Sequence, residues 1–381
     1  MSARTPVRAP AVGAVHRALG AALAAALAAA LACAPFRLAA QPTAQPAVSP
    51  VASPAAPAAA SAAASAAASP AAGSGIERLV QRGIAEFDAT RHAAARVTLE
   101  AVLDASPRHA RAHFYLGRIA LAQGRDDDAI EHLERAAELA PAQGAHHAWL
   151  GRAYGRRATG DGLAPVRMAY AVRTRDALQR ATELDADDVE SRILLVRYHL
   201  EAPRLLGGGV EPAIAQAEAI RRRDAYRGSM QLGLVYEHAQ RPADAERAYR
   251  EAARLRPDRA APWVHLGTLL TTRAQWDAAF AALDEALRRA PDDRSVLYYY
   301  GEAVALSRQR LPQGLALLQR YLATASADAS ASALAWAYYR LGMIHEARGE
   351  RAPAVTAYRS AVERAPQVEE FGRALGRIGS A

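Results

Sequence analysis

Apolar and small residues recur along residues 76–378 with the spacing of amphipathic helices. In the stretch LGLVYEHAQRPADAERAYREAARLRP, Leu232–Pro257, apolar residues fall three or four positions apart in two runs, and a polar segment with a proline separates them. Gly233 lies inside the first run, where glycine costs a helix about 1 kcal/mol relative to alanine. The pattern predicts two helices joined by a short turn, with an unexplained glycine in the first.

That glycine recurs along the chain. Glycines in the same local context are Gly83, Gly117, Gly151, Gly233, Gly267, Gly301 and Gly342. Four of the six intervals between them are 34 residues, one is two periods plus 14, and one is a period plus 7. A fixed period of this length is typical of a stacked array of helical repeats. The two irregular intervals are therefore interpreted as insertions in the array.

The clearest unit is PWVHLGTLLTTRAQWDAAFAALDEALRRAP, residues 262–291. Its characteristic residues are Trp263, Leu266 and Gly267 on a first helix, Ala279, Leu283 and Ala286 on a second, and Pro291 at the end. This unit resembles the tetratricopeptide repeat (TPR), a 34-residue helix-turn-helix with the pattern W-x2-L-G-x2-Y, A-x3-F and P. Glycine on the first helix and alanine on the second allow the two helices to approach closely.

Eight such units begin near residues 76, 110, 144, 188, 226, 260, 294 and 335, and a last helix near 368–378 would cap them. The resemblance implies an all-α fold, a right-handed superhelical solenoid of about eight TPR units.

Two units depart from the pattern. The third has extra residues at 157–173, and the fourth has Leu195 in place of the glycine and a longer turn at 203–210.

Residues 1–40 have the order of an export signal. Three arginines without an acidic residue precede an apolar run, ALGAALAAALAAALACAPF, and small residues follow it. This order predicts a secretory signal peptide cleaved after Ala40, which would place the protein in the periplasm or cell envelope. Lipidation of Cys33, the only cysteine, and an uncleaved anchor are the alternatives, and only these would attach the chain to a membrane.

Residues 41–74 contain only Ala, Pro, Ser, Gln, Val, Thr and Gly. A segment without charges or aromatic rings, and with recurrent prolines, cannot build a core and is predicted to be a disordered linker. The predicted organisation is therefore a signal peptide at 1–40, a linker at 41–74 and a TPR solenoid at 75–381.

Charge and composition exclude several classes of function. All 47 basic residues are arginine, and the formal net charge is +8. The absence of lysine excludes a P-loop lysine and Schiff-base chemistry. Acidic and basic residues are interspersed along the repeats, so no stripe for nucleic acid is expected.

No group of residues points to catalysis. The glycines at 207–209 are not followed by the residues of a phosphate loop and are interpreted as a turn. His109 and His113 have i,i+4 spacing, and His146 and His147 begin the next repeat, but no cysteine or carboxylate completes a metal site. Acidic residues at the start of second helices, such as Asp126 and its neighbours, suit the helix dipole. We expect no enzyme activity, no cofactor and no metal.

Function is then expected from a surface. The TPR resemblance implies that a peptide or protein segment binds along the concave face lined by first helices. In the N-terminal half, the residues expected on this face are Arg111, Phe114, Arg118, Arg152, Arg156 and Arg192. In the C-terminal half, they are Tyr298, Glu302, Trp336, Tyr339 and Met343. The arginines would hold carboxylates and the aromatic rings would seat an apolar side chain, unless arginine is simply the default polar residue of this composition.

Two hypotheses of function follow. The favoured one is a noncatalytic scaffold of the cell envelope that binds a protein or peptide partner in the groove. The alternative is an accessory subunit of an envelope enzyme or secretion complex, docked through the insertions at 157–173 and 203–210, because insertions on one face of a repeat array often carry binding.

Overall fold

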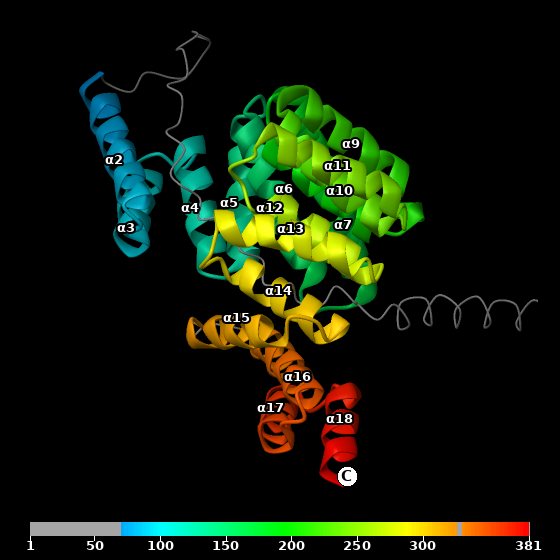
Figure 1. Cartoon of the computed structure of the whole chain (residues 1–381). Helices are drawn as coiled ribbons and strands as arrows, with labels where there is room; N and C mark the ends of the chain where they lie inside the picture. Colours follow the sequence, from blue (N-terminus) through cyan, green and yellow to red (C-terminus); the bar gives the residue numbers. More distant parts are fainter. Residues whose placement is uncertain (1–69, 326–329, 381) are drawn as a thin grey trace, which may run out of the picture. The chain divides into compact units, whose positions relative to one another are not determined.

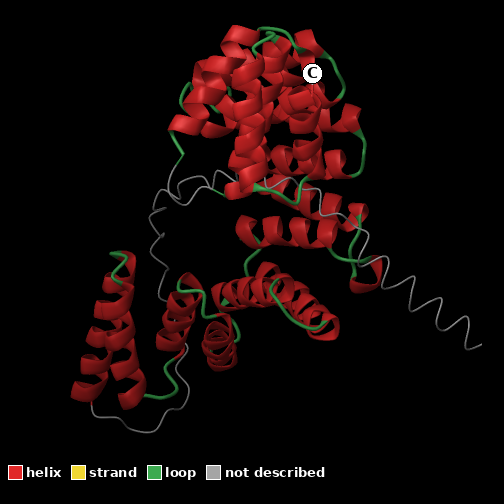
Figure 2. Ribbon diagram, turned by 90° about the horizontal axis from the view of Figure 1, so that it is seen from below, coloured by secondary structure: helices red, strands yellow, loops and turns green. Residues whose placement is uncertain are grey.

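A computed structural model describes residues 70–325 and 330–380, and every regular element in these ranges is a helix (Figures 1 and 2). The predicted signal peptide, Cys33 and residues 41–69 of the predicted linker lie outside the described residues. The first helix begins at Pro70, so the last residues of the predicted linker belong to a helix. None of the described helices is both long and apolar enough to cross a membrane.

The described residues form two compact units, 70–309 and 310–380, with the gap at 326–329 in the second. The helices of the N-terminal unit pair in order along the chain. They are α2 (Pro70–Asp88) and α3 (His92–Ala105), α4 (Ala110–Ala122) and α5 (Asp126–Leu139), α6 (Gly144–Thr159) and α7 (Ala164–Leu184), α8 (Val189–Glu201) and α9 (Val210–Arg223), α10 (Ala225–His238) and α11 (Pro242–Leu255), α12 (Ala261–Thr272) and α13 (Trp276–Arg289), and finally α14 (Arg294–Ser307).

The C-terminal unit contains the remaining four helices. These are α15 (Leu311–Ala323), α16 (Ala331–Ala347), α17 (Arg351–Arg364) and α18 (Glu369–Ser380). In order along the chain, α14 and α15 are the seventh pair, α16 and α17 the eighth, and α18 is the predicted capping helix. Phe371 on α18 is fully buried in a cluster with Tyr339 and Tyr358. The predicted all-α fold class is confirmed, and the order of the helices is compatible with eight helix pairs and a cap.

The recurrent glycine is explained by the second helix of each pair. A Cβ atom on Gly117 would lie 2.6 Å from Cγ of Leu133, and one on Gly267 would lie 2.6 Å from Cγ of Leu283. Carbon atoms in ordinary contact are about 3.5–4.0 Å apart, so no side chain fits between the helices at these points. The glycine therefore offsets its cost in helix propensity by allowing a leucine to pack against bare backbone.

In two units a tyrosine replaces this leucine and needs a partner for its hydroxyl. Tyr249 donates a hydrogen bond to Glu237, and Tyr358 donates one to Glu346 at 2.6 Å. Burial raises the pKa of the Tyr358 phenol and of the Glu237 carboxyl. Each glutamate lies four residues after the recurrent glycine, at a position where the leucine-containing units carry no acid. In both units that carry the buried tyrosine, a glutamate is therefore present to accept the hydrogen bond of its hydroxyl.

The turn between the two helices of a unit passes through the left-handed region. The residues with positive φ at this position, seven after the glycine, are Thr90, Gly124, Gln240, Ala274, Arg308 and Gly349, with φ between 53° and 75°. Only glycine adopts this conformation without steric cost. Four of the six turns therefore carry a residue with a Cβ that strains the backbone.

The two insertions differ in structure. Most of the extra residues of the third pair extend α7 to 21 residues and leave a short turn at 160–163. The insertion of the fourth pair contains a 3-10 turn, η1 (Arg204–Leu206), followed by Gly207 with φ 86°. A Cβ on Gly208 would overlap the carbonyl oxygen of Ala202. The glycines at 207–209 thus form the predicted structural turn.

Candidate functional site

Rings and guanidinium groups alternate across the first helices of the N-terminal unit. The guanidinium carbon of Arg118, on α4, lies 4.4 Å from the ring centroid of Phe87, on α2, and 4.5 Å from that of Trp149, on α6. The guanidinium carbon of Arg152 lies 4.7 Å from the same Trp149 ring. We call these four residues the cation–π ladder. It joins three consecutive first helices through interactions worth about 0.5–2 kcal/mol each.

Arg118 is the centre of the ladder and is partly buried. The rings of Tyr115 and Phe114 lie 5.1 and 5.4 Å from its guanidinium carbon. Burial lowers the pKa of Arg118, and Arg152 lowers it further, whereas Tyr115 and Asp88 raise it. The buried Nε of Arg118 has no hydrogen-bond partner. An arginine remains charged under these conditions, so the site holds a positive charge with unused hydrogen-bonding capacity.

Neither Arg118 nor Arg152 forms an ion pair in the described part of the chain, whereas the other predicted arginines have polar partners. Arg111 pairs with Glu77 at 2.8 Å. Arg156 pairs with Asp126 at 3.0 Å and donates to the Leu121 carbonyl oxygen at 2.7 Å. Arg192 donates to the Gln216 side chain at 3.3 Å and to the Ala186 carbonyl oxygen at 3.4 Å. These three arginines are therefore already engaged in contacts within the array.

The predicted aromatic positions are mostly packed. Phe114 is buried, and its ring lies 4.8 Å from that of His146. Tyr298 is also buried and makes an edge contact with Tyr299 at 5.2 Å. Glu302 lies on α14 and is partly exposed. Phe114 and Tyr298 thus contribute mainly to packing, although both lie on first helices.

Trp336 and Tyr339 hold the capping helix. The ring of Phe371 lies 4.9 Å from each of these two rings, and the Tyr339 hydroxyl donates to Glu370 at 2.8 Å. Desolvation and this carboxylate raise the pKa of Tyr339 to about 12. Met343 packs against the same cluster. The place that we expected for an apolar residue of a partner is filled by Phe371 of the chain itself.

One histidine pair, between α4 and α5, is a contact that the sequence did not predict. His113 approaches His132 on α5, with the two Nδ1 atoms 3.1 Å apart, while His113 Nε2 lies 3.0 Å from the Pro107 carbonyl oxygen. His146 is buried against the Ala136 carbonyl oxygen. Among residues 70–325 and 330–380, no group of three or more His, Cys, Asp or Glu could hold a metal ion.

The insertions expose two leucines. Leu163, in the turn before α7, is 75% exposed, and Leu205, in η1, is 71% exposed. The neighbouring Leu206 is buried, and its carbonyl oxygen accepts hydrogen bonds from Tyr198 and Arg175. The insertion of the fourth pair is thus a fixed turn with one apolar side chain directed outward.

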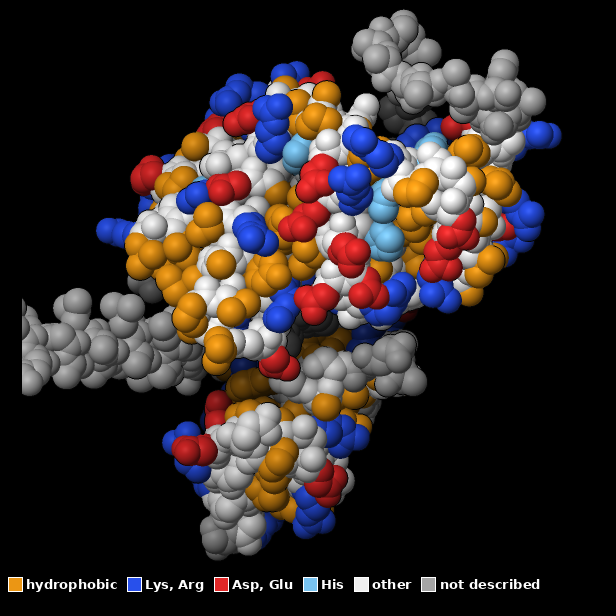
Figure 3. All heavy atoms as spheres, turned by 180° about the vertical axis from the view of Figure 1, so that it is seen from behind, with side chains coloured by type: hydrophobic (Ala, Val, Ile, Leu, Met, Phe, Trp, Pro, Cys, Tyr) orange, Lys and Arg blue, Asp and Glu red, His pale blue; other side chains and the backbone are white. Residues whose placement is uncertain are grey.

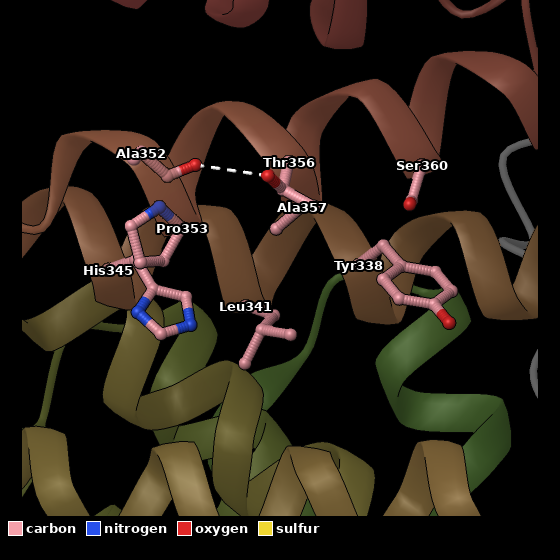
Figure 4. Close-up of a pocket in the computed structure, with 8 residues that line it drawn as sticks. All are labelled: Tyr338, Leu341, His345, Ala352, Pro353, Thr356, Ala357 and Ser360. Atoms are coloured by element: carbon pink, nitrogen blue, oxygen red, sulfur yellow. Dashed lines mark hydrogen bonds between the residues drawn. The ribbon is translucent and has the colours of Figure 1, made fainter.

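The C-terminal unit has a shallow hollow of about 420 Å³ between α16 and α17 (Figure 4). Its lining residues are Tyr338, Leu341, His345, Ala352, Pro353, Thr356, Ala357 and Ser360. The Thr356 hydroxyl donates to the Ala352 carbonyl oxygen at 3.1 Å, and His345 pairs with Glu350 at 2.6 Å. Thr356 and His345 are thus already engaged in contacts within this unit, so the ladder remains the stronger candidate site.

Charged side chains of both signs lie on the face of the described residues that is opposite to the view of Figure 1 (Figure 3). Figure 3 shows basic and acidic side chains interspersed on the face seen from behind. Many charged side chains of the described residues are paired, such as Arg197 with Glu201 at 2.9 Å and Arg135 with Glu138 at 2.9 Å. This face of the described residues therefore has no extended patch of positive or of negative charge.

Comparison with protein families settles what the repeats are. Two family models, both described as tetratricopeptide repeat, match the chain, one at residues 80–144, 207–260 and 266–331 and the other at 336–367. The chain belongs to the tetratricopeptide repeat superfamily. The comparison with curated proteins found no match.

Solved TPR structures resemble the chain in fold. Yeast Tom70 has a TM-score of 0.55 and 14% identity, with 80% of this chain and 63% of that chain covered. This chain thus spans less than two thirds of that structure's length. A TPR protein from Parabacteroides merdae has a TM-score of 0.44 and 13% identity over 80% of this chain and 98% of that one. At 14% identity, the likeness to Tom70 shows the fold alone.

Two of the four residues of the cation–π ladder were not predicted from the sequence. Phe87 and Trp149 were not among the expected surface residues, although each lies on a first helix. Trp149 falls four residues before Ala153 and three before Arg152, on the same side of α6 as that arginine. Aromatic residues one repeat away from an arginine could have been found by aligning the first helices by their glycines.

Proposed function

We propose that the protein is a noncatalytic scaffold of the cell envelope, which binds a segment of a partner protein along the first helices of its N-terminal unit. TPR arrays serve in protein–protein interaction, and TPR proteins are generally noncatalytic scaffolds. The location in the envelope rests on the order of residues in the predicted signal peptide.

The cation–π ladder is the observation that carries this proposal. Its four side chains come from three consecutive repeats, are partly exposed, and include the two arginines without an ion pair. Rigid aromatic residues and arginine are the residue types enriched at the energetic centres of protein interfaces. A surface already ordered by its own stacking loses little conformational entropy when a partner binds.

A second candidate is docking through the insertions. The exposed Leu163 and Leu205 lie in the two insertions, and they favour this candidate because insertions on one face of a repeat array often carry binding. Under this alternative, the protein would be an accessory subunit of an envelope complex.

Site-directed photo-crosslinking in the full chain separates the two. A photoreactive residue replaces Ala145, which is exposed on α6, four residues before Trp149 and seven before Arg152. Matched positions are Leu163 in the insertion and Glu138 on the second helix α5. Crosslinks to one partner from position 145, and none from 138, are expected.

Each outcome has a distinct meaning. Crosslinking from position 163 alone would assign the interaction to the insertions and contradict binding along the first helices. Equal crosslinking from all three positions, or from none, would contradict a specific surface on this unit. Turnover of a substrate by the purified chain would contradict a noncatalytic role.

A further inference from the structure

We propose that His113 and His132 chelate a late first-row divalent cation, Cu²⁺, Ni²⁺ or Zn²⁺, which would join the two helices of the second repeat pair. The two Nδ1 atoms, on α4 and α5, are 3.1 Å apart. This inference goes beyond the proposed function, because it concerns a metal ion rather than a partner protein.

Hydrogen bonding fixes the protons of the pair. A carbonyl oxygen can only accept, so the His113 Nε2 atom, 3.0 Å from the Pro107 carbonyl oxygen, carries a proton. Neutral His113 therefore has its lone pair on Nδ1, and Nδ1 of His132 donates to it. Histidines that bind metals usually donate their other N–H group to a carbonyl oxygen or carboxylate in this way, which orients the ring. His113 is thus already held in the tautomer of an Nδ1 ligand.

The separation of the two nitrogens suits two ligands of one ion. Imidazole nitrogens lie about 2.0–2.1 Å from such a metal, so two of them are about 2.9 Å apart at a right angle and about 3.4 Å apart at the tetrahedral angle. The observed 3.1 Å falls between these values. The ring centroids are 5.3 Å apart, so the nitrogens face each other head-on. The rings must turn relative to each other by about 70–90° before both lone pairs meet at the ion.

His132 is the ring that can turn. Its only hydrogen bond among the described residues is the one to His113, whereas His113 is also held by the Pro107 carbonyl oxygen. The His132 side chain is half-buried, and the torsion that turns a histidine ring has a broad minimum. When its Nδ1 binds the ion, the proton leaves this atom and another is taken up from water at Nε2. The ring therefore stays neutral, with no net gain or loss of protons.

The ligands select the class of ion. Imidazole suits copper, nickel and zinc, whereas Mg²⁺ and Ca²⁺ prefer oxygen ligands. Affinity at such a site rises from Ni²⁺ to Cu²⁺ and falls again at Zn²⁺. Since no group of three His, Cys, Asp or Glu is in place among the described residues, water would fill the remaining positions around the ion.

The next repeat provides a natural control. His147 lies 34 residues after His113, and its Nε2 atom likewise lies 3.0 Å from a proline carbonyl oxygen, that of Pro141. When the two repeats are aligned by the leucine that packs against the recurrent glycine, Ala177 is the counterpart of His132. The third repeat thus has the first ligand without the second, and it should not chelate a metal.

The test measures metal binding by the full chain, prepared without a histidine tag. Isothermal titration calorimetry with CuCl₂, NiCl₂, ZnCl₂ and MgCl₂ gives the affinities. We expect a saturable site for Cu²⁺, weaker binding of Ni²⁺ and Zn²⁺, and no binding of Mg²⁺. Bound Cu²⁺ should also raise the midpoint of thermal unfolding, because the ion joins two helices in the folded state only.

Substitutions locate the ion. H113A and H132A are each expected to weaken Cu²⁺ binding at least about 10-fold, since each leaves a single imidazole. H147A, the matched control, is expected to change the affinity less than about 2-fold. The electron paramagnetic resonance spectrum of bound Cu²⁺ should show splitting from two nitrogens in the native chain and from one in H132A. Circular dichroism checks that each variant is folded.

Several results would overturn the inference. Absence of saturable Cu²⁺ binding by the native chain would show that the pair is only a hydrogen bond between two helices. Equal affinity in the native chain and H132A would place the ion at other histidines, and an equal loss in H147A would show unspecific binding. Splitting from a single nitrogen in the native chain would contradict chelation. None of these results bears on the proposed scaffold role, because crosslinking from position 145 does not depend on the metal.

Discussion

The recurrent glycine leads to a sharp prediction at Gly267. Replacing it with alanine improves helix propensity by about 1 kcal/mol. The new Cβ, however, would lie 2.6 Å from Cγ and 2.8 Å from Cδ2 of Leu283, which is fully buried on α13. To restore ordinary contact, the helices or the leucine must move by about 1 Å, and overpacking of this kind costs about 1–3 kcal/mol. We expect G267A to be destabilised by about 1 kcal/mol net.

A double-mutant cycle isolates the cause. L283A alone leaves a cavity and is expected to cost about 2–4 kcal/mol. In G267A/L283A the clash is absent, so the double variant should be more stable than the sum of the single effects predicts, by about 1–3 kcal/mol. Urea unfolding followed by circular dichroism at 222 nm gives the three free energies.

Gly372 is the matched control. It lies on α18, it is exposed, and a Cβ placed on it would meet nothing within 4 Å. G372A should therefore stabilise the C-terminal unit by up to about 1 kcal/mol. If G267A proves as stable as the native protein, or if the cycle shows no coupling between positions 267 and 283, close helix approach does not explain the glycine.

Three further predictions concern turns and buried polar groups. Replacing the strained turn residues Thr90 or Ala274 by glycine should raise the free energy of unfolding by about 1 kcal/mol each, measured by urea unfolding; a loss of stability would contradict left-handed strain there. Burial lowers the pKa of His265 to about 4, so the folded state resists its protonation. Stability should therefore fall between pH 6.5 and pH 4 by about 2 kcal/mol more than in H265Q, and parallel pH profiles would refute this. For the Tyr249–Glu237 pair, E237A should cost about 1–3 kcal/mol, whereas E237Q keeps an acceptor and should cost less than half as much; equal losses in thermal or urea unfolding would show that the hydrogen bond is unimportant.

The sequence alone determined the repeat and its architecture. The period of 34 residues shows in the spacing of Gly83, Gly117 and Gly151, because each unit must solve the same local packing problem with the same residue types. The turn at 207–209 was predictable for a similar reason, since backbone conformation there depends on glycine itself. Periodicity and local backbone conformation depend on residues that are close in the sequence, so both can be predicted without the three-dimensional structure.

Only the tertiary structure decided which arginines have no ion pair within the array and are free to bind a partner. Arg111 and Arg118 look alike in the sequence, yet Arg111 meets Glu77 one full period away, whereas Arg118 meets the rings of Phe87 and Trp149. In the same way, Trp336 is covered by the capping helix through Phe371. Partners of a long side chain come from adjacent repeats at distances of about one period, and small differences in rotamer and helix offset select among them. For that reason, the class of surface could be predicted from the sequence, whereas the residues that remain free to bind a partner could not.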